Sequence, residues 1–162
     1  MDRPGHSNPR HVTDVVSPGT VAMVTTRGRL GHRSRPLTIA SVDGDRLCFL
    51  VSEGSDWVRD LQPGTDTECT VADPGDNHYV ALSGESRVVH DPELIERLWS
   101  PAANAFFDGA DDPDVRVLEV GVREGQWWEG PDSRAGTLLA MVRSAITKDE
   151  SSMGTEGVVT PG

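Results

Sequence analysis

Short runs of β-branched and other apolar residues, each ended within a few residues by a turn signal, constrain the fold of this chain more than any other feature. The first run begins at Thr20, and Asp43-Gly44 is typical of the compact turns between runs. Helical segments are too few for the strand–helix alternation of a parallel sheet. The sequence therefore predicts an α+β fold that is mainly antiparallel β, a barrel or a sandwich of six or seven short strands. The expected strands cover residues 20–26, 33–42, 46–52, 67–72, 78–89, 114–123 and 125–130.

Three short helices complete the expected secondary structure. Ser55 precedes a helix over 56–61 and is a candidate N-cap, because its hydroxyl can accept an N–H of the first turn. A second helix begins at Asp91, where a cap residue, a proline and an acid follow one another in the order that a helix start favours. A third helix is expected over 136–146.

The length of 162 residues suits one domain. Residues 1–13 are polar and without periodicity, so we expect a flexible N-terminal arm. Residues 148–162 are rich in Gly, Ser, Thr and Glu and predict a disordered C-terminal tail. The folded body then spans 14–147.

The chain has no apolar run near the ~20 residues of a membrane span and no apolar leader at its N-terminus. Cys48 and Cys69 lie in apolar segments without metal-ligand spacing, which predicts buried free thiols. We therefore expect no membrane partner and a cytoplasmic location, where thiols stay reduced.

The charge is strongly acidic, with 15 Lys and Arg against 26 Asp and Glu, for a net charge of -11. This balance argues against nucleic-acid binding, which needs clustered cations. Of the 15 basic residues 14 are Arg, and Lys148 is the only Lys. One basic cluster, Arg27 to Arg35, has two open interpretations: a solvated hairpin, or a site for a small phosphorylated ligand, since Arg matches phosphate geometry.

Three groups of residues are candidates for binding a ligand. Arg33 and Arg35 are two apart on a predicted strand and therefore share a face. Ser52 and Ser55 bracket a strand-to-helix turn that could hold an anion, although Ser55 is equally a plain helix cap. Trp127 and Trp128 point to opposite faces of a strand, so one is expected in the core and the other can meet a ligand or a partner.

Two further observations limit the chemistry. The acidic set is interpreted as turn-forming and solubilising rather than as a metal site, and no metal is expected; its members are Asp73, Asp76, Asp111, Asp112 and Asp114. No nucleophile with a base, and no proton-transfer pair, can be assembled from the candidates. An enzyme of this kind would need a cofactor to carry its reaction.

The ordered segments resemble the pyridoxamine 5'-phosphate oxidase-like family, an FMN-binding split barrel, and most closely its general stress protein branch. The resemblance covers roughly residues 20–146. It rests on AMVTT at 22–26, RSRPL at 33–37, FLVS at 49–52, SDWV at 55–58, ADPGDNHYV at 72–80, LWSP at 98–101, Phe107, Asp112-Pro113 and WWEGP at 127–131. The fold it implies is a six- to seven-stranded split β-barrel with short peripheral helices.

The resemblance implies a homodimer with two flavin sites at the subunit interface. Residues of the second strand would line the flavin and its phosphate, namely Arg33, Ser34, Arg35 and Pro36. Ser52 and Ser55 would hold phosphate, and Trp128 would come from the partner subunit. Val51 and Trp57 stand where family members commonly have Thr and Lys, so this chain lacks one hydroxyl and one ammonium at the flavin site.

The function this implies is a flavoprotein that passes electrons between reduced FMN, or a related deazaflavin, and a small organic acceptor. An alternative is a split barrel without FMN, whose dimer groove binds or converts a small aromatic or hydrophobic ligand without redox chemistry. A third is a purely structural stress-response protein. Oxidation of pyridoxamine 5'-phosphate itself is disfavoured, because the segments after Arg87 offer no cationic cluster for a second phosphate.

Overall fold

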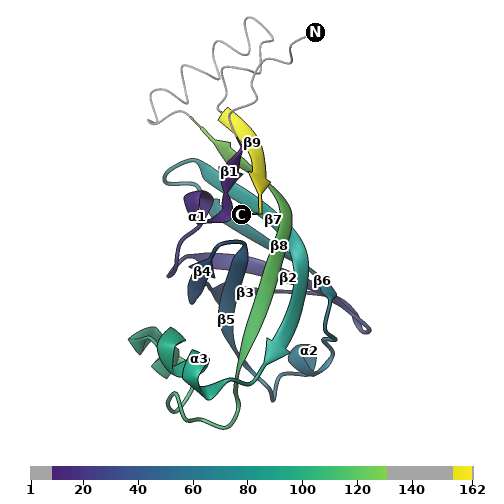
Figure 1. Ribbon diagram of the computed structural model, residues 1–162, viewed down its shortest axis with the longest axis vertical. Helices are drawn as coiled ribbons and strands as arrows, with labels where there is room; N and C mark the ends of the chain where they lie inside the picture. Colours follow the sequence, from purple (N-terminus) through teal and green to yellow (C-terminus); the bar gives the residue numbers. More distant parts are fainter. Residues whose placement is uncertain (1–8, 131–154, 162) are drawn as a thin grey trace, which may run out of the picture.

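A computed structural model describes residues 9–130 and 155–161 of the protein, and within them one twisted, nine-stranded sheet organises the chain (Figure 1). The strands are β1 (Arg10–His11), β2 (Val21–Gly28), β3 (Gly31–Thr38), β4 (Ser41–Asp43), β5 (Arg46–Ser52), β6 (Thr65–Asp73), β7 (His78–Val89), β8 (Val115–Glu129) and β9 (Thr155–Thr160). The helical elements are α1 (Val12–Val15), α2 (Asp56–Arg59), α3 (Pro92–Leu98) and the 3-10 helix Pro101–Ala105. The mainly antiparallel fold with short helices is confirmed.

The sheet order is β1-β9-β8-β7-β6-β2-β3, with β5 on the other part of β8 and β4 beside β5. The predicted strand 33–42 divides because the chain changes partners. The N–H of Ile39 donates to Thr20 in the connection before β2, and that of Ala40 donates to Cys48 in β5. The sheet thus curls from β3 to β4 without a ladder between β3 and β5, which makes it a split rather than a closed barrel.

The main core fills the inside of this curl. Its largest fully buried side chains are Trp127 and Phe49, packed with valines, leucines and Ile39 from most of the strands. A second, smaller cluster lies under α3, where Ile95 packs against Cys48, Val115 and Val117. Both thiols are free and buried, as the sequence predicts.

A register shift in β8 decides which of its residues enter the core. The sequence predicts two strands, 114–123 and 125–130, but β8 is one strand that runs the length of the molecule (Figure 1). Opposite Ser83 and Gly84, β8 contributes one extra residue, Arg123. A Cβ on Gly84 would lie 1.9 Å from the carbonyl oxygen of Gly121, so this close approach requires glycine.

The chain ends differ from the sequence prediction. Within the expected arm 1–13 and the expected tail 148–162, β1 and β9 pair in parallel, and β9 pairs antiparallel with β8. Val12 and Val159 are buried in the main core. The physical reason is that β8 extends beyond β5, so its edge needs a partner, and the β-branched end of the chain supplies one. The helix predicted over 136–146 lies outside the described residues.

The short helices follow their predicted starts. Asp91 caps α3 as predicted, its carboxylate accepting the N–H of Leu94 at 3.1 Å. Ser55 is the residue before α2, but its side chain accepts no hydrogen bond from that described helix, so it is not a side-chain cap. The 3-10 helix after α3 was not predicted. In the part of the chain that the structure describes, no helix has the length and apolarity needed to cross a bilayer.

Candidate functional site

The predicted arginine pair lies on β3, at the edge of the sheet. Among the described strands β3 pairs only with β2, which suits the proline within it. Arg33 and Arg35 face one side, and Ser34 and Pro36 face the other, as strand alternation predicts. The hydroxyl of Ser34 lies 2.7 Å from that of Thr25 on β2, and Pro36 is exposed.

Arg35 is the most unusual side chain in this region. Its guanidinium lies over the ring of Trp57, 3.7 Å from the centroid, in a cation–π contact. Nη1 donates to the hydroxyl of Thr26 at 3.4 Å, while Nη2 is buried and has no partner among the described residues. Burial, with the nearby charge of Arg33, lowers the pKa of Arg35 to about 10. Arg35 is therefore a desolvated cation with an unused donor, which favours an oxygen acceptor or an anion.

Two contacts hold α2 against the β2–β3 hairpin and so position Arg35 and Trp57. The first is the Arg35–Trp57 stack itself. The second is the buried carboxylate of Asp60, which accepts the N–H of Leu30 at 3.0 Å and lies 3.5 Å from the Arg29 guanidinium. A Cβ on Gly28 would lie only 2.1 Å from this carboxylate, so the hairpin can approach Asp60 only with glycine there.

The turn between β5 and α2 holds an acidic side chain that the sequence did not place there. The Ser52 hydroxyl donates to one carboxylate oxygen of Asp114, and the N–H of Gly54 donates to the other at 2.7 Å. These two hydrogen bonds lower the pKa of Asp114. No local signal links Ser52 to a residue 62 positions later. Val51 faces the main core, 3% exposed, and Ser55 is half-buried.

The tryptophan pair divides as predicted. Trp127 is fully buried, with the guanidinium of Arg10 over its ring at 3.8 Å from the centroid. Trp128 points outward and is half-buried, and its indole N–H donates to Glu156 of β9 at 2.9 Å. Between β8 and β3 lie four strand spacings, about 19 Å along the sheet. Trp128 therefore lies far along the sheet from Arg33 and Arg35 of the same chain.

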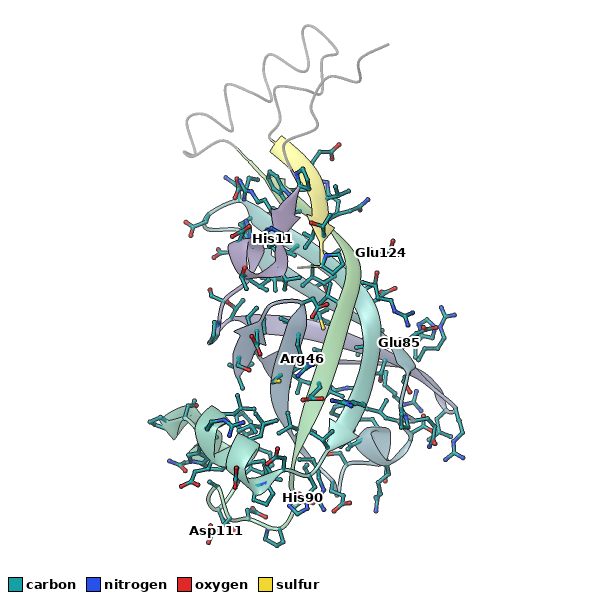
Figure 2. The ribbon with its side chains drawn as sticks, viewed as in Figure 1. His11, Arg46, Glu85, His90, Asp111 and Glu124 are labelled. Atoms are coloured by element: carbon teal, nitrogen blue, oxygen red, sulfur yellow. The ribbon has the colours of Figure 1, made fainter. Side chains whose placement is uncertain are left out.

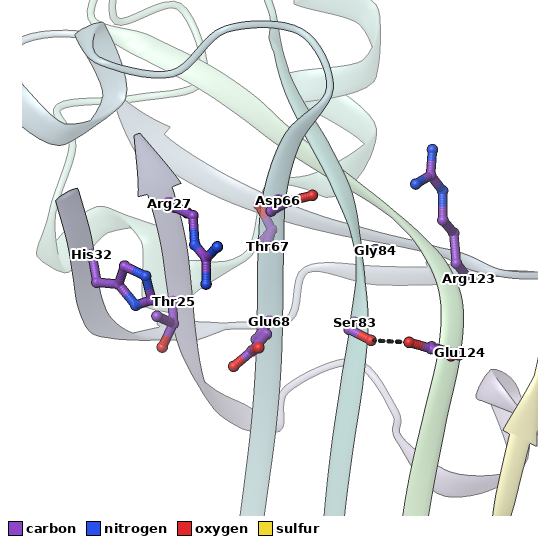
Figure 3. Close-up of a pocket in the computed structure, with 10 residues that line it drawn as sticks. All are labelled: Thr25, Arg27, His32, Asp66, Thr67, Glu68, Ser83, Gly84, Arg123 and Glu124. Carbon is purple, nitrogen blue, oxygen red and sulfur yellow. Dashed lines mark hydrogen bonds between the residues drawn. The ribbon is translucent and has the colours of Figure 1, made fainter. Parts of the chain in front are cut away.

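The outward face of the sheet carries apolar side chains at one end and a charged depression at the other. Val21, Met23, Tyr79 and Val158 are 56%, 45%, 39% and 45% exposed. The depression has a volume of about 280 Å³ (Figure 3). Its walls carry the imidazole of His32 and charges of both signs, from Arg27, Asp66, Glu68, Arg123 and Glu124.

Most of the acidic set acts as the sequence predicts. Asp73 accepts the N–H groups of Gly75 and Asp76, and Asp112 accepts those of Asp108 and Asp114, as turn-forming carboxylates do. Within residues 9–130 and 155–161, no group of three or more His, Cys, Asp and Glu could hold a metal ion. Asp111 lies in the loop at the α3 end of the molecule (Figure 2).

Comparison with known proteins shows which family has this architecture. The family described as pyridoxamine 5'-phosphate oxidase like matches residues 7–152. The chain belongs to this family. A protein assigned as general stress protein 26 from Jannaschia sp. CCS1 is 25% identical, with a TM-score of 0.68 over 88% of this chain and 92% of the other. The resemblance to the general stress protein branch is thereby confirmed.

Two further relatives are consistent with this family assignment. General stress protein 26 of Bacillus subtilis is 36% identical over 42 residues, which is 26% of this chain and 30% of that protein. The general stress FMN/FAD binding protein of Xanthomonas citri has the same fold, with a TM-score of 0.62, 24% identity and coverage of 71% of this chain and 83% of the other.

The residues present fit the flavin that the resemblance implies in one part of the site and do not fit its phosphate in another. The buried Nη2 of Arg35, which has no partner among residues 9–130 and 155–161, suits a carbonyl, hydroxyl or phosphate oxygen. At the β5–α2 turn, where the resemblance puts phosphate, the Ser52 and Gly54 donors are already used by Asp114. Trp57 adds an aromatic ring there in place of a charge.

Proposed function

We propose that this protein binds a flavin and passes electrons between it and a small organic acceptor. Membership of the family supports the proposal, as does a structural neighbour described as FMN/FAD binding. The observation that carries it is Arg35, a cation held on an aromatic ring, whose buried Nη2 has no partner in the described part of the chain. Such a donor is costly to leave unpaired, and a ligand oxygen would satisfy it.

In this proposal the chain binds and orients, and the bound flavin supplies the redox chemistry. β3 contributes the Arg35 donor, the Arg33 charge and the Ser34 hydroxyl, with Pro36 on the exposed side of the strand. Trp57 positions Arg35 by stacking on its guanidinium. Val51 shapes the site only through the core, since its side chain faces inward.

We also propose a homodimer that completes the site. Tyr79, Met23, Val21 and Val158 form an exposed apolar region on one sheet face, as an interface would need. Trp128 is four strands along the sheet from β3 of its own chain, and in this proposal it reaches the flavin of a second copy. Two-fold symmetry would then form two equal sites.

The direct test is the visible absorption spectrum of the purified protein, followed by mass identification of any compound released on denaturation. We expect the two visible bands of an oxidised flavin, either as purified or after adding riboflavin or FMN. A colourless protein that binds neither compound would contradict the proposal and favour the alternative groove for a non-redox aromatic ligand.

Substitution of Arg35 tests the residue that carries the proposal. Arg35→Met keeps an apolar stem on Trp57 but removes the donor, and should weaken flavin binding about 10-fold or more, the value of one charge-assisted hydrogen bond. Arg97→Met, an exposed arginine in the last turn of α3, is the matched control and should leave the affinity unchanged. Fluorescence titration measures both. Equal flavin affinities of the two variants would show that Arg35 does not bind the flavin.

A further inference from the structure

The β5–α2 turn is already occupied by an anion that belongs to the chain. Asp114 accepts both the Ser52 hydroxyl and the Gly54 N–H, and these hydrogen bonds stabilise its ionised form. A phosphate at this turn would have to displace Asp114 from both donors. It would also lie beside a carboxylate, and like charges at such range repel.

Two cations next to the turn, Arg116 and Arg59, are paired with other carboxylates. Arg116 forms an ion pair with Glu53, and Arg59 pairs with Asp56 at 2.6 Å. Trp57 contributes a ring and no charge. The carboxylates of Asp114, Glu53 and Asp56 therefore lie in or beside Ser52–Ser55, and Arg116 and Arg59 are already paired with two of them, so this turn offers a dianion little net attraction.

We propose that Asp114 is a specificity residue that excludes the 5'-phosphate, so that the site takes a flavin whose ribityl chain ends in a neutral hydroxyl. This inference rests on the proposed flavin-binding function. A hydroxyl can donate to the carboxylate of Asp114 or Asp56, whereas a phosphate dianion offers them only acceptor oxygens. The Arg35 donor serves either form of the flavin, so it does not decide between them.

The experiment compares riboflavin with FMN by fluorescence titration of the full-length protein. We expect riboflavin to bind about 10-fold tighter than FMN, the effect of losing about one charge-assisted hydrogen bond to the phosphate. Asp114→Ala frees both donors and removes the charge, and should shift the ratio of the two affinities toward FMN by about 10-fold or more. Asp114→Asn, which removes the charge and keeps the side-chain shape, should shift it in the same direction by less.

Two further variants test whether the higher FMN affinity of Asp114→Ala depends on the donors of this turn. Ser52→Ala added to Asp114→Ala removes one freed donor and should reverse part of the gain for FMN. Asp111→Ala changes the net charge equally in the same loop and should leave the ratio unchanged, since Asp111 is exposed and has no contact with Ser52 or Gly54 among the described hydrogen bonds. Circular dichroism of each variant verifies folding.

The outcomes separate this inference from the function on which it rests. FMN binding tighter than riboflavin, with a ratio that Asp114→Ala and Asp114→Asn leave unchanged, would overturn the inference and leave flavin binding intact. A ratio that moves equally in Asp111→Ala would also overturn it, because net charge alone would then explain the effect. Binding of neither flavin would overturn both.

Discussion

Single residues set how closely the elements around the site approach one another. At Gly28 even one methyl group would lie 2.1 Å from the carboxylate of Asp60, which accepts the N–H of Leu30 at the hairpin tip. Asp60 cannot give way easily, because it is buried at the end of α2. The absence of a side chain at this position therefore keeps the hairpin that carries Arg35 in contact with α2.

We predict that Gly28→Ala destabilises the protein by about 1–3 kcal/mol, as overpacking does, and weakens flavin binding by displacing the hairpin. Gly121→Ala is the control. A Cβ there would meet only the carbonyl oxygen of Glu85, at an ordinary 3.9 Å, so its effect should be within about 0.5 kcal/mol. Urea unfolding measures both variants, and equal stabilities would contradict the proposed contact.

The ion pair between Arg10 and Glu129 gives a pH dependence at the same scale. The Arg10 hydrogen bond lowers the pKa of Glu129 below its ordinary value of 4.5, and His78 lies 3.5 Å from the same carboxylate. A lowered folded-state pKa means that the stabilisation is complete above the unfolded pKa and is lost as the pH falls through the folded one.

We predict that Glu129→Gln lowers the melting temperature at pH 7 and loses less stability than the wild type on acidification below about pH 4.5. The change at pH 7 should correspond to about 1 kcal/mol or less, because both side chains are about one-third exposed. Melting curves over a pH series test this. Parallel wild-type and variant curves would show that the pair contributes nothing measurable.

At the scale of elements, β9 belongs to the folded body. Val159 is 2% exposed and packs in the main core, although it lies only three residues from the end of the chain. Its strand also supplies Glu156, which accepts the indole N–H of Trp128. The last strand therefore supports a candidate site residue as well as the core.

We predict that Val159→Ala lowers the free energy of unfolding by about 2 kcal/mol, through lost burial and the cavity left behind. Leu30→Ala, at a hairpin position that is 62% exposed, should change it by about 0.5 kcal/mol or less. Equal effects would mean that β9 does not pack as described. Urea unfolding measures both.

At the scale of the whole molecule, the apolar region on the outward sheet face is the surface through which we propose that two chains complete the site. Met23 lies on β2, one strand in from the edge of the sheet, with the strands β3 and β6 on either side. Phe106 is more exposed, at 80%, but lies beyond the sheet after the 3-10 helix. A comparison of Met23 with Phe106 therefore distinguishes a residue of the proposed interface from an exposed apolar residue outside it.

We predict that Met23→Glu converts the proposed dimer to a monomer and lowers flavin affinity, because a charge would be buried in the proposed interface. Phe106→Glu should leave the protein dimeric. Light scattering after size-exclusion chromatography gives the masses. A dimeric Met23→Glu variant would show that the interface does not include Met23. A monomeric wild type would contradict the proposed homodimer.

The sequence by itself determined the elements whose signals are local. β5 and β7 have the predicted bounds, because apolar runs and turn residues lie side by side in the chain. The start of α3 follows from Asp91 and the two residues after it. The arginine pair on one face of β3 follows from alternation alone, and the ordered motifs were sufficient to indicate the family.

Only the tertiary structure decided the contacts that give the site its character. Ser52 meets Asp114, and Arg35 meets Trp57, because separate elements pack together, and no spacing in the chain encodes those meetings. Which tryptophan enters the core depends on the extra residue at Arg123, since one residue reverses every later face of a strand. The pairing of β9 with β8 likewise depends on an edge that exists only after β5 and β7 are in place. Local free energies select helices and strands, whereas these features depend on long-range packing and on the hydrogen bonds that burial demands.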